Sequence, residues 1–162
     1  MAPTNIAIGL TSAAFHPDGM LFAAGSTGGQ IKVFDVKSGS NAANFDCPSA
    51  VQAIAFSENG TWLASVSEGQ TTVAIWDLRK AAQIKQLEFG MAIRSIEWDY
   101  TGQFLAAGGP SGIAVQSYAK TTKSWTESFR SAVPSTAVLW GPRAQSLVSV
   151  HEDGVLTVLS AA

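Results

Sequence analysis

The chain has 162 residues, enough for one domain with a buried core. Ten Lys and Arg against twelve Asp and Glu give a formal net charge of −2, which excludes the basic field that dominates sequence-independent nucleic-acid binding. The single cysteine, Cys47, excludes an internal disulfide framework and a multi-cysteine metal site.

The first predicted elements are four short strands. Apolar runs predict strands near residues 6–15, 20–25, 31–35 and 41–45, with turn residues between them. No segment has a convincing helical period. The Gly-rich stretches at 26–29 and 108–112 lack the Lys-Ser/Thr ending and the following helix of a phosphate-binding loop, so we interpret them as turns.

The same pattern recurs three more times. Aromatic residues at positions 15, 56, 98 and 140 are separated by 41, 42 and 42 residues. Seven residues after each aromatic comes a bulky apolar residue, and two residues further a small one. These are, in turn, Phe22 and Ala24, Leu63 and Ser65, Leu105 and Ala107, and Leu147 and Ser149. Matched columns at one period predict a repeat protein.

The period indicates the kind of repeat. Units of about 40 to 45 residues with four strands, closing on an aromatic-Asp pair, are typical of WD-type β-propeller blades. Phe34-Asp35 and Trp76-Asp77 form that pair in the first two units, and the later units lack it. We predict an all-β WD-repeat β-propeller over residues 1–162, with blades at about 5–46, 50–88, 92–129 and 134–160, the last without its fourth strand.

The blade count affects closure of the ring. Propellers have about 4 to 8 blades, and seven is usual for such repeats. We therefore expect either half of a seven-bladed propeller or four blades that pair as a dimer. Open blade faces and edges favour self-association or pairing with a missing half.

Several runs carry a resemblance to one WD family. They include Phe15-His16-Pro17-Asp18-Gly19, Phe56-Ser57-Glu58-Asn59-Gly60, Trp76-Asp77-Leu78-Arg79-Lys80 and the stretch 102–109. In order, they resemble the C-terminal WD-repeat domain of the pre-mRNA-processing factor nineteen family over nearly the whole chain. The Gly-His dipeptide that commonly opens a WD repeat is absent. We therefore expect packing, more than a His-based polar network, to hold the blades.

The resemblance implies a nuclear U-box ubiquitin ligase that scaffolds spliceosome activation and serves DNA repair, with the propeller as substrate and partner receptor. No U-box or heptad pattern occurs in this chain, so we expect it to hold no catalytic residues, metal or cofactor. Its expected partners are proteins of a splicing-associated complex and ubiquitination substrates, with no membrane and with RNA contact disfavoured. The alternatives are a generic WD scaffold of another complex and a propeller hydrolase, which would need converging acid and base residues.

Loops on a rigid scaffold carry function, and propellers usually bind partners on the face formed by the loops after the second and fourth strands. The candidate partner-binding residues there are Ser49, Ser67, Glu68, Met91, Arg94 and Arg130. The basic residues Lys37, Arg79, Lys80, Lys120 and Lys123 follow third strands on the opposite rim, where we expect them to be solvated. The repeat signature, expected to be structural, is Phe15, Asp35, Phe56, Trp76, Asp77, Trp98 and Trp140.

Three further features have structural interpretations. His151-Glu152-Asp153 is predicted to enter a hairpin turn in which Asp153 accepts backbone hydrogen bonds, and not to form a metal or catalytic site. Cys47 has no neighbouring His to activate it and is expected to be an unreactive thiol. Trp62 and Trp125 lie outside the repeat columns and are candidates for partial exposure.

Overall fold

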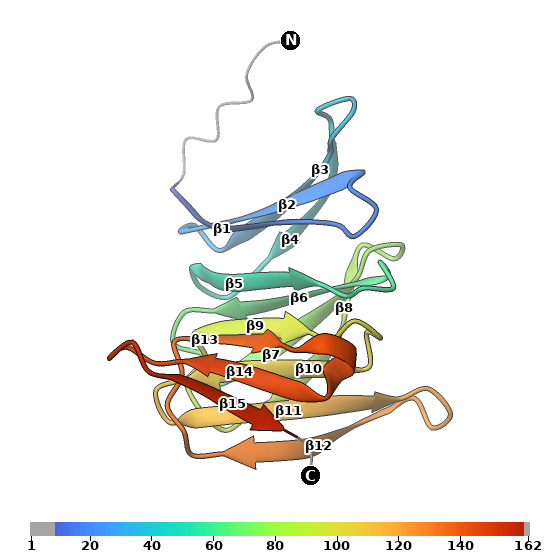
Figure 1. Ribbon diagram of the computed structural model, residues 1–162. Coiled ribbons are helices and arrows are strands. Elements are labelled where there is room, and N and C mark those ends of the chain that lie inside the picture. The colour runs from blue at the N-terminus through green and yellow to red at the C-terminus, as the bar shows by residue number, and fades with distance from the viewer. Residues whose placement is uncertain (1–8, 161–162) are drawn as a thin grey trace.

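The computed structural model describes residues 9–160, which form fifteen strands and one short 3-10 helix (Figure 1). The strands build four antiparallel sheets that follow one another along the chain. The first is β1 (Leu10–Phe15), β2 (Leu21–Ser26), β3 (Gln30–Asp35) and β4 (Asn41–Asp46); the second is β5 (Val51–Phe56), β6 (Trp62–Ser67), β7 (Thr72–Asp77) and β8 (Ala82–Glu88). The third is β9 (Ser95–Trp98), β10 (Phe104–Gly109), β11 (Gly112–Ala119) and β12 (Ser124–Ser131); the fourth is β13 (Ala137–Trp140), η1 (Pro142–Ala144), β14 (Ser146–Val150) and β15 (Leu156–Ser160).

This architecture confirms the predicted all-β, WD-type propeller fold. The strand predicted near residues 6–15 begins at Leu10 within the described part, and residues 6–8 lie outside it.

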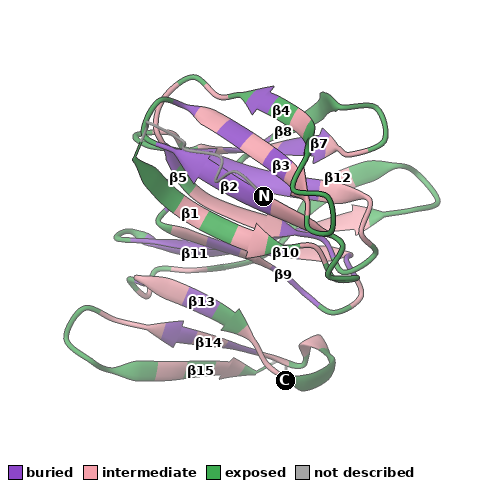
Figure 2. Ribbon diagram, turned by 90° about the horizontal axis from the view of Figure 1, so that it is seen from above, coloured by how far each residue is buried: buried purple, intermediate pink, exposed green. Residues whose placement is uncertain are grey.

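The sheets pack face to face along an arc, with the first strand of each sheet next to the first strand of its neighbour (Figures 1 and 2). Turns between first and second strands and between third and fourth strands lie at one end of the strands, on the right in Figure 1. Loops after second and fourth strands lie at the other end, on the left. The arc therefore has two loop faces of different composition.

Burial on both faces of the middle strands holds the sheets together. Leu63 of β6 packs in the cluster shared with the first sheet, and its neighbour Ala64 packs in the cluster shared with the third. Both are fully buried. Successive strand residues point to opposite faces of a sheet, so adjacent apolar residues such as these pack against the preceding and the following sheet at the same time. Full burial of one Leu or Ile side chain contributes about 1.5–3 kcal/mol.

The aromatic column behaves differently at the ends of the arc. Phe56 and Trp98 are 8% and 5% exposed, because each packs on the preceding sheet. Phe15 occupies the same column but is 64% exposed, since no sheet within residues 9–160 precedes its own. Trp140 is half-buried. Phe15 therefore shares the column position of Phe56 and Trp98 without their burial.

Hydrogen bonds between residues about one repeat apart also join neighbouring sheets. The indole Nε1 of Trp98 donates to the carbonyl of Ala55 (3.2 Å), and that of Trp140 donates to the carbonyl of Glu97 (3.1 Å). Each bond joins the first strands of two neighbouring sheets. The register between sheets is therefore fixed by a specific donor and acceptor as well as by apolar contact.

A buried hydrogen bond between two side chains of the second sheet has no counterpart in the fourth. Trp76 Nε1 donates to Ser65 Oγ at 2.8 Å, and the Trp76 ring stacks on Phe45 of the first sheet. In the fourth sheet Leu159 pairs with Leu147 as Trp76 pairs with Leu63, so a leucine replaces the indole. Ser149, the counterpart of Ser65, is consequently buried with its Oγ unpartnered among the described residues.

We predict opposite effects for the two equivalent serines. Ser65→Ala should lower the free energy of unfolding by about 1–3 kcal/mol, because it leaves a buried indole N–H without an acceptor. Ser149→Ala removes an unpartnered hydroxyl and should be neutral or stabilising. Urea unfolding of both variants measures the difference. Equal destabilisation by the two substitutions would contradict the argument.

A second prediction concerns Glu97, whose carboxylate accepts from the backbone N–H of Trp140 at 2.9 Å. Burial raises the pKa of Glu97 above the ordinary 4.5, and nearby Glu58 adds to the rise against the lowering effect of that hydrogen bond. The folded state thus holds the proton to higher pH than the unfolded chain, so ionised Glu97 opposes folding increasingly as the pH rises above 4.5.

Glu97→Gln keeps an acceptor and removes the charge. Its free energy of unfolding relative to the parent should therefore increase between a pH below 4.5 and about pH 7. Thermal melts at the two pH values test this, with Glu68→Gln, an exposed carboxylate that does not contribute to the pKa shift of Glu97, as control. A pH-independent difference for Glu97→Gln would overturn the assignment.

Candidate protein-interaction face

The loops that follow second and fourth strands form one face of the arc, which we call the interaction face. Its loops cover residues 27–29, 47–50, 68–71, 89–94, 110–111, 132–136 and 151–155. The first four of these loops and the one at 132–136 are those that the sequence predicts as the receptor surface, whereas the sequence assigns 110–111 and 151–155 only to turns.

Backbone hydrogen bonds hold the loop at 47–50, which connects the first two sheets, to a loop of each sheet. The N–H of Cys47 donates to the carbonyl of Gly29 (2.7 Å), and the N–H of Glu68 donates to that of Ala50 (2.7 Å). Gly29 has a positive φ of 78°, and a Cβ there would lie 2.9 Å from the carbonyl oxygens of Cys47 and Ser49. Only glycine allows this approach. The face is therefore a fixed surface at the junction of the first two sheets.

A cleft of about 320 Å³ opens on this face between the third and fourth sheets. Its walls are Arg94, Pro110, Pro134, Ser135, Thr136, His151, Glu152 and Asp153. Arg94 and Glu152, from neighbouring sheets, form an exposed ion pair across it. An exposed pair of this kind contributes little to stability, so both charges can exchange partners at small cost.

The predicted partner-binding residues divide into two groups. Glu68 and Arg94 are exposed, and Ser49 is half-buried with its Oγ donating to the carbonyl of Glu68 (2.8 Å). Ser67 and Met91 are 6% exposed each, so these two candidates belong to the scaffold and cannot offer a contact surface.

Arg130, the remaining candidate, is already occupied by neighbours. Its Nε donates to Glu127 at 2.9 Å, and one terminal nitrogen donates to the carbonyl of Phe89 at 2.8 Å. The hydrogen bond from Arg130 lowers the pKa of Glu127. Arg130 therefore links the loop before β9 to the outer strand β12.

Sequence reasoning missed Glu152 as a face residue. Glu152 lies two repeats after Glu68, since 152 − 68 = 84, and both are in loops that follow second strands. The repeat period thus carried the signal. Its neighbours follow the predicted hairpin: the N–H of Val155 donates to Asp153 Oδ1 (3.0 Å), and His151 Nε2 lies 3.1 Å from Thr157 Oγ1.

The described residues hold no group of three His, Cys, Asp or Glu side chains that could bind a metal ion. No helix in the described part is long and apolar enough to cross a membrane.

The opposite face carries the five basic rim residues, all exposed, in the turns between third and fourth strands. The carboxylates beside them are engaged in their own turns. Asp35 accepts from the N–H of Ser38 (2.7 Å), which lowers its pKa, and Asp77 accepts from the N–H groups of Arg79 and Lys80 (2.9 and 3.0 Å). Asp35 and Asp77 therefore shape separate turns.

The two tryptophans outside the repeat columns pack with each other on that side. The ring centroids of Trp62 and Trp125 are 5.9 Å apart, and Tyr118 lies edge-on to Trp62 at 4.9 Å. Trp98 completes the cluster at 6.0 Å from Trp62. Mutual packing of this kind favours a structural role.

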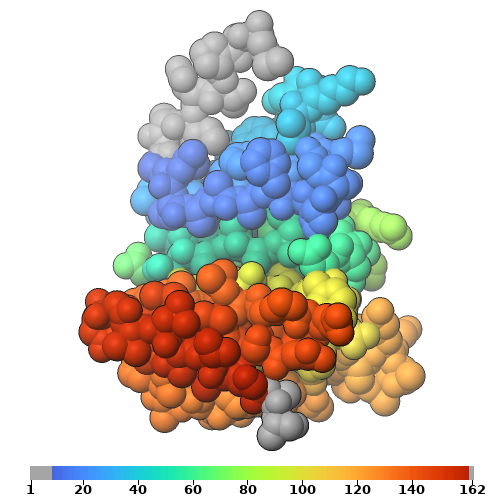
Figure 3. Space-filling view, viewed as in Figure 1, coloured from blue at the N-terminus to red at the C-terminus, as the bar shows by residue number. Residues whose placement is uncertain are grey.

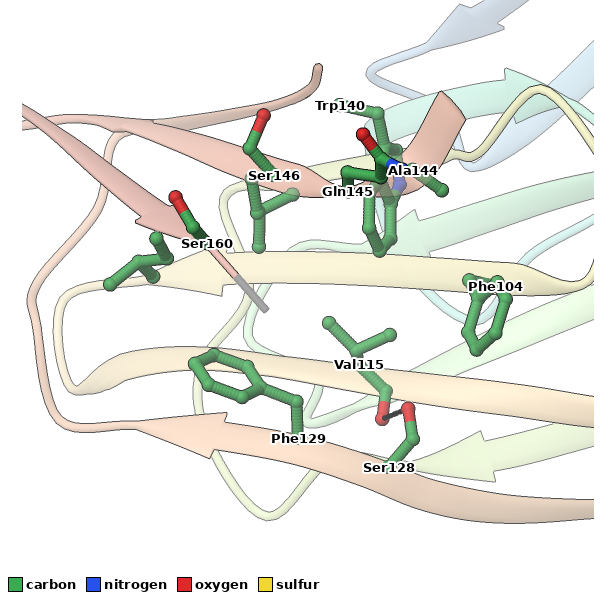
Figure 4. Close-up of a pocket in the computed structure, with 11 residues that line it drawn as sticks. Phe104, Val115, Ser128, Phe129, Trp140, Ala144, Gln145, Ser146 and Ser160 are labelled. Carbon is green, nitrogen blue, oxygen red and sulfur yellow. Dashed lines mark hydrogen bonds between the residues drawn. The ribbon is translucent and has the colours of Figure 1, made fainter. Parts of the chain in front are cut away.

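A second cleft of about 320 Å³ lies between the outer strands of the third and fourth sheets (Figure 4). Phe129 and Val115 form one wall, and Leu147 and Leu159 belong to the other. No charged side chain lines it. It occurs at the sheet in which Leu159 replaces the tryptophan of the second sheet, so we interpret it as a packing gap.

Similarity to known proteins agrees with this fold. The family model described as "WD domain, G-beta repeat" matches residues 7–35 and 39–77. The chain thus contains WD repeats in an all-β, propeller-type fold.

Several curated relatives carry the name "Pre-mRNA-processing factor 19". The Homo sapiens protein is 39% identical over 156 residues, covering 93% of this chain and 30% of that protein. The Dictyostelium discoideum protein is 42% identical over 114 residues, covering 66% and 22%. The Schizosaccharomyces pombe protein is 34% identical over 122 residues, covering 75% and 25%. The chain thus spans less than a third of the length of these relatives.

Two solved structures are similar to this chain, and at their low sequence identity the similarity concerns the fold only. A chain of Kuenenia stuttgartiensis hydrazine synthase aligns with a TM-score of 0.81 at 16% identity, over 99% of this chain and 48% of that one. A chain of the mitotic checkpoint complex aligns with a TM-score of 0.81 at 17% identity, over 94% and 50%.

The reactivity of Cys47 tests whether the loop at 47–50 is ordered in the folded protein. The thiol is half-buried near Ser65 Oγ (3.9 Å), and burial raises its pKa above the ordinary 9.0. Since the thiolate is the nucleophile, iodoacetamide at about pH 7 should alkylate folded protein much more slowly than urea-unfolded protein. Mass spectrometry follows the reaction. Equal rates for the two forms would show that the loop entering the second sheet is open.

Proposed function

We propose that this WD-repeat chain recognises protein partners within a splicing-associated assembly and does so through its interaction face. The observation that carries the proposal is the 39% identity to "Pre-mRNA-processing factor 19" over 93% of the chain. A rigid scaffold that presents ordered loops is suited to binding.

The finer part of the proposal concerns the longer protein of which such a domain is a part. There the chain would act as partner and substrate receptor of a nuclear ubiquitin ligase that scaffolds spliceosome activation and serves DNA repair. Ubiquitin transfer would be carried out by a U-box outside this chain.

The charges of the interaction face favour a protein partner over RNA. Glu68, Glu152 and Asp153 are exposed on it, and its two arginines, Arg94 and Arg130, are both ion-paired. A phosphate backbone would meet repulsion there, because nucleic-acid affinity depends on unneutralised Lys and Arg. A segment carrying Lys or Arg is the complementary ligand.

The test compares the two faces of the arc with matched charge removals. We expect Glu68→Ala with Glu152→Ala to weaken binding to an isolated splicing complex by about tenfold. The control, Lys37→Ala with Lys120→Ala, removes two exposed charges from the opposite rim and should leave binding unchanged. Surface plasmon resonance with the immobilised 162-residue chain measures both, and thermal melts establish that both variants fold.

Two outcomes would overturn the proposal. Loss of binding only in the rim variant would move recognition to the basic face. Absence of binding to splicing proteins, together with retained binding to an identified complex of another pathway, would favour a generic WD scaffold.

A further inference from the structure

The cleft on the interaction face lies between two sheets of this chain, so both of its walls belong to the described residues. It opens between the third and fourth sheets with a volume of about 320 Å³, at the lower end of the range of about 300–1,000 Å³ for small-ligand pockets. The hairpin at 151–155, which forms one wall, projects at the left of the fourth sheet (orange to red in Figure 3). The cleft therefore has room for one side chain of a partner.

Backbone hydrogen bonds fix the loop at 132–136, which forms the floor of the cleft. The N–H of Ser135 donates to the carbonyl of Gly109 in the third sheet (2.9 Å). The N–H of Thr136 donates to the carbonyl of Val150 in the fourth sheet (2.8 Å). The cleft is thus formed before a ligand arrives, and preorganisation of this kind lowers the cost of binding.

Arg94 and Glu152 form their ion pair across this cleft, from Nη1 to Oε1. The backbone N–H of Arg94 donates to the carbonyl of Gly108 (2.8 Å), so its guanidinium reaches from the third sheet to the hairpin of the fourth. The two side chains are 44% and 71% exposed. Because water screens a pair with this exposure, the pair contributes little to stability. A charged group from outside can therefore replace Arg94 without disturbing the fold.

The balance of charges in the cleft favours an incoming cation. Arg94 offsets Glu152, and Asp153 remains as a second exposed carboxylate on the same wall. Asp153 uses its Oδ1 in its own hairpin, and His151 Nε2 lies 3.1 Å from Thr157 Oγ1. When Arg94 is displaced, the wall offers two carboxylates to one ligand. The complementary group is the positively charged end of a Lys or Arg side chain.

We propose that this cleft receives one lysine or arginine side chain of a protein partner, and that Arg94 occupies its place in the free chain. The inference rests on the proposed function, because it names the chemistry that the interaction face recognises. Pro110 and Pro134 offer apolar surface to the alkyl stem of the incoming side chain, while its charged end meets Glu152 and Asp153. Arg94 is thus an internal competitor, whose effect on binding is opposite in sign to that of Glu152.

The experiment is a chemical-shift titration of the isotope-labelled 162-residue chain with short Gly-Ser peptides that carry one central Arg, Lys or Gln. We expect the Arg and Lys peptides to shift the amide signals of Ser135, Thr136 and Glu152, which line the cleft. The dissociation constant should be about 1 mM, because a single side chain in an open cleft binds weakly. The Gln peptide should leave these signals unchanged.

Two substitutions in the ion pair should act in opposite directions. Glu152→Gln should weaken binding of the Arg peptide about fivefold, since it removes a charge that the ligand meets. Arg94→Gln should tighten binding about two- to fivefold, since removal of the competitor raises the fraction of chains with a vacant cleft. The matched controls, Glu58→Gln and Lys120→Gln, remove one exposed charge of each sign from the opposite face and should leave the affinity unchanged at physiological ionic strength. Thermal melts establish that all four variants fold.

Weaker binding after Arg94→Gln, or equal binding of the Gln peptide, would overturn the proposal. So would a parent chain whose cleft amides respond to neither cationic peptide at about 10 mM. If that chain still bound an isolated splicing complex, the interaction face would keep its proposed function and only the cleft would lose its role. If the cationic peptides bound and the splicing complex did not, the cleft would stand as a receptor for a basic side chain and the splicing assignment would fall.

Discussion

Burial of both faces of the middle strands in the second and third sheets is the constraint on which this structure depends. A sheet covered on one side only can alternate apolar and polar residues, whereas Leu63, Ala64 and Val66 of β6 are all fully buried. Such a strand needs a sheet on each side. The arc, the two loop faces and the uncovered ends all follow from this need, because each sheet requires a predecessor and a successor.

The fold could be predicted from the sequence because several patterns that are weak on their own recur at one period. One Phe-x-Pro-Asp-Gly turn is common, but aromatic residues at 15, 56, 98 and 140 with matched apolar and small columns point to one architecture. The side of the arc on which each loop lies also follows, because strands alternate in direction.

The candidate site was harder to predict than the fold. Burial of Ser67 and Met91 depends on how the loops of one sheet are covered by the next, and that coverage leaves no trace in the local sequence. The exposure of Phe15 follows from the number of blades and not from its local sequence pattern, because no sheet within residues 9–160 precedes its own. The position of Glu152 on the interaction face could have been predicted from its offset of two repeats from Glu68. The sequence pattern of that segment, however, indicates a hairpin turn and says nothing of where the Glu152 side chain lies.

Trp76 in the second sheet and Leu159 in the fourth occupy equivalent positions, so the two sheets contribute unequally to stability. In stacked repeats the stability of the whole is approximately a sum of unit and nearest-neighbour terms. The junction between the first two sheets has a stacked indole, whereas that between the last two has a leucine in its place and a cleft. Cooperativity should therefore weaken along the chain, so that β13 to β15 open in sub-global fluctuations while the first three sheets remain closed.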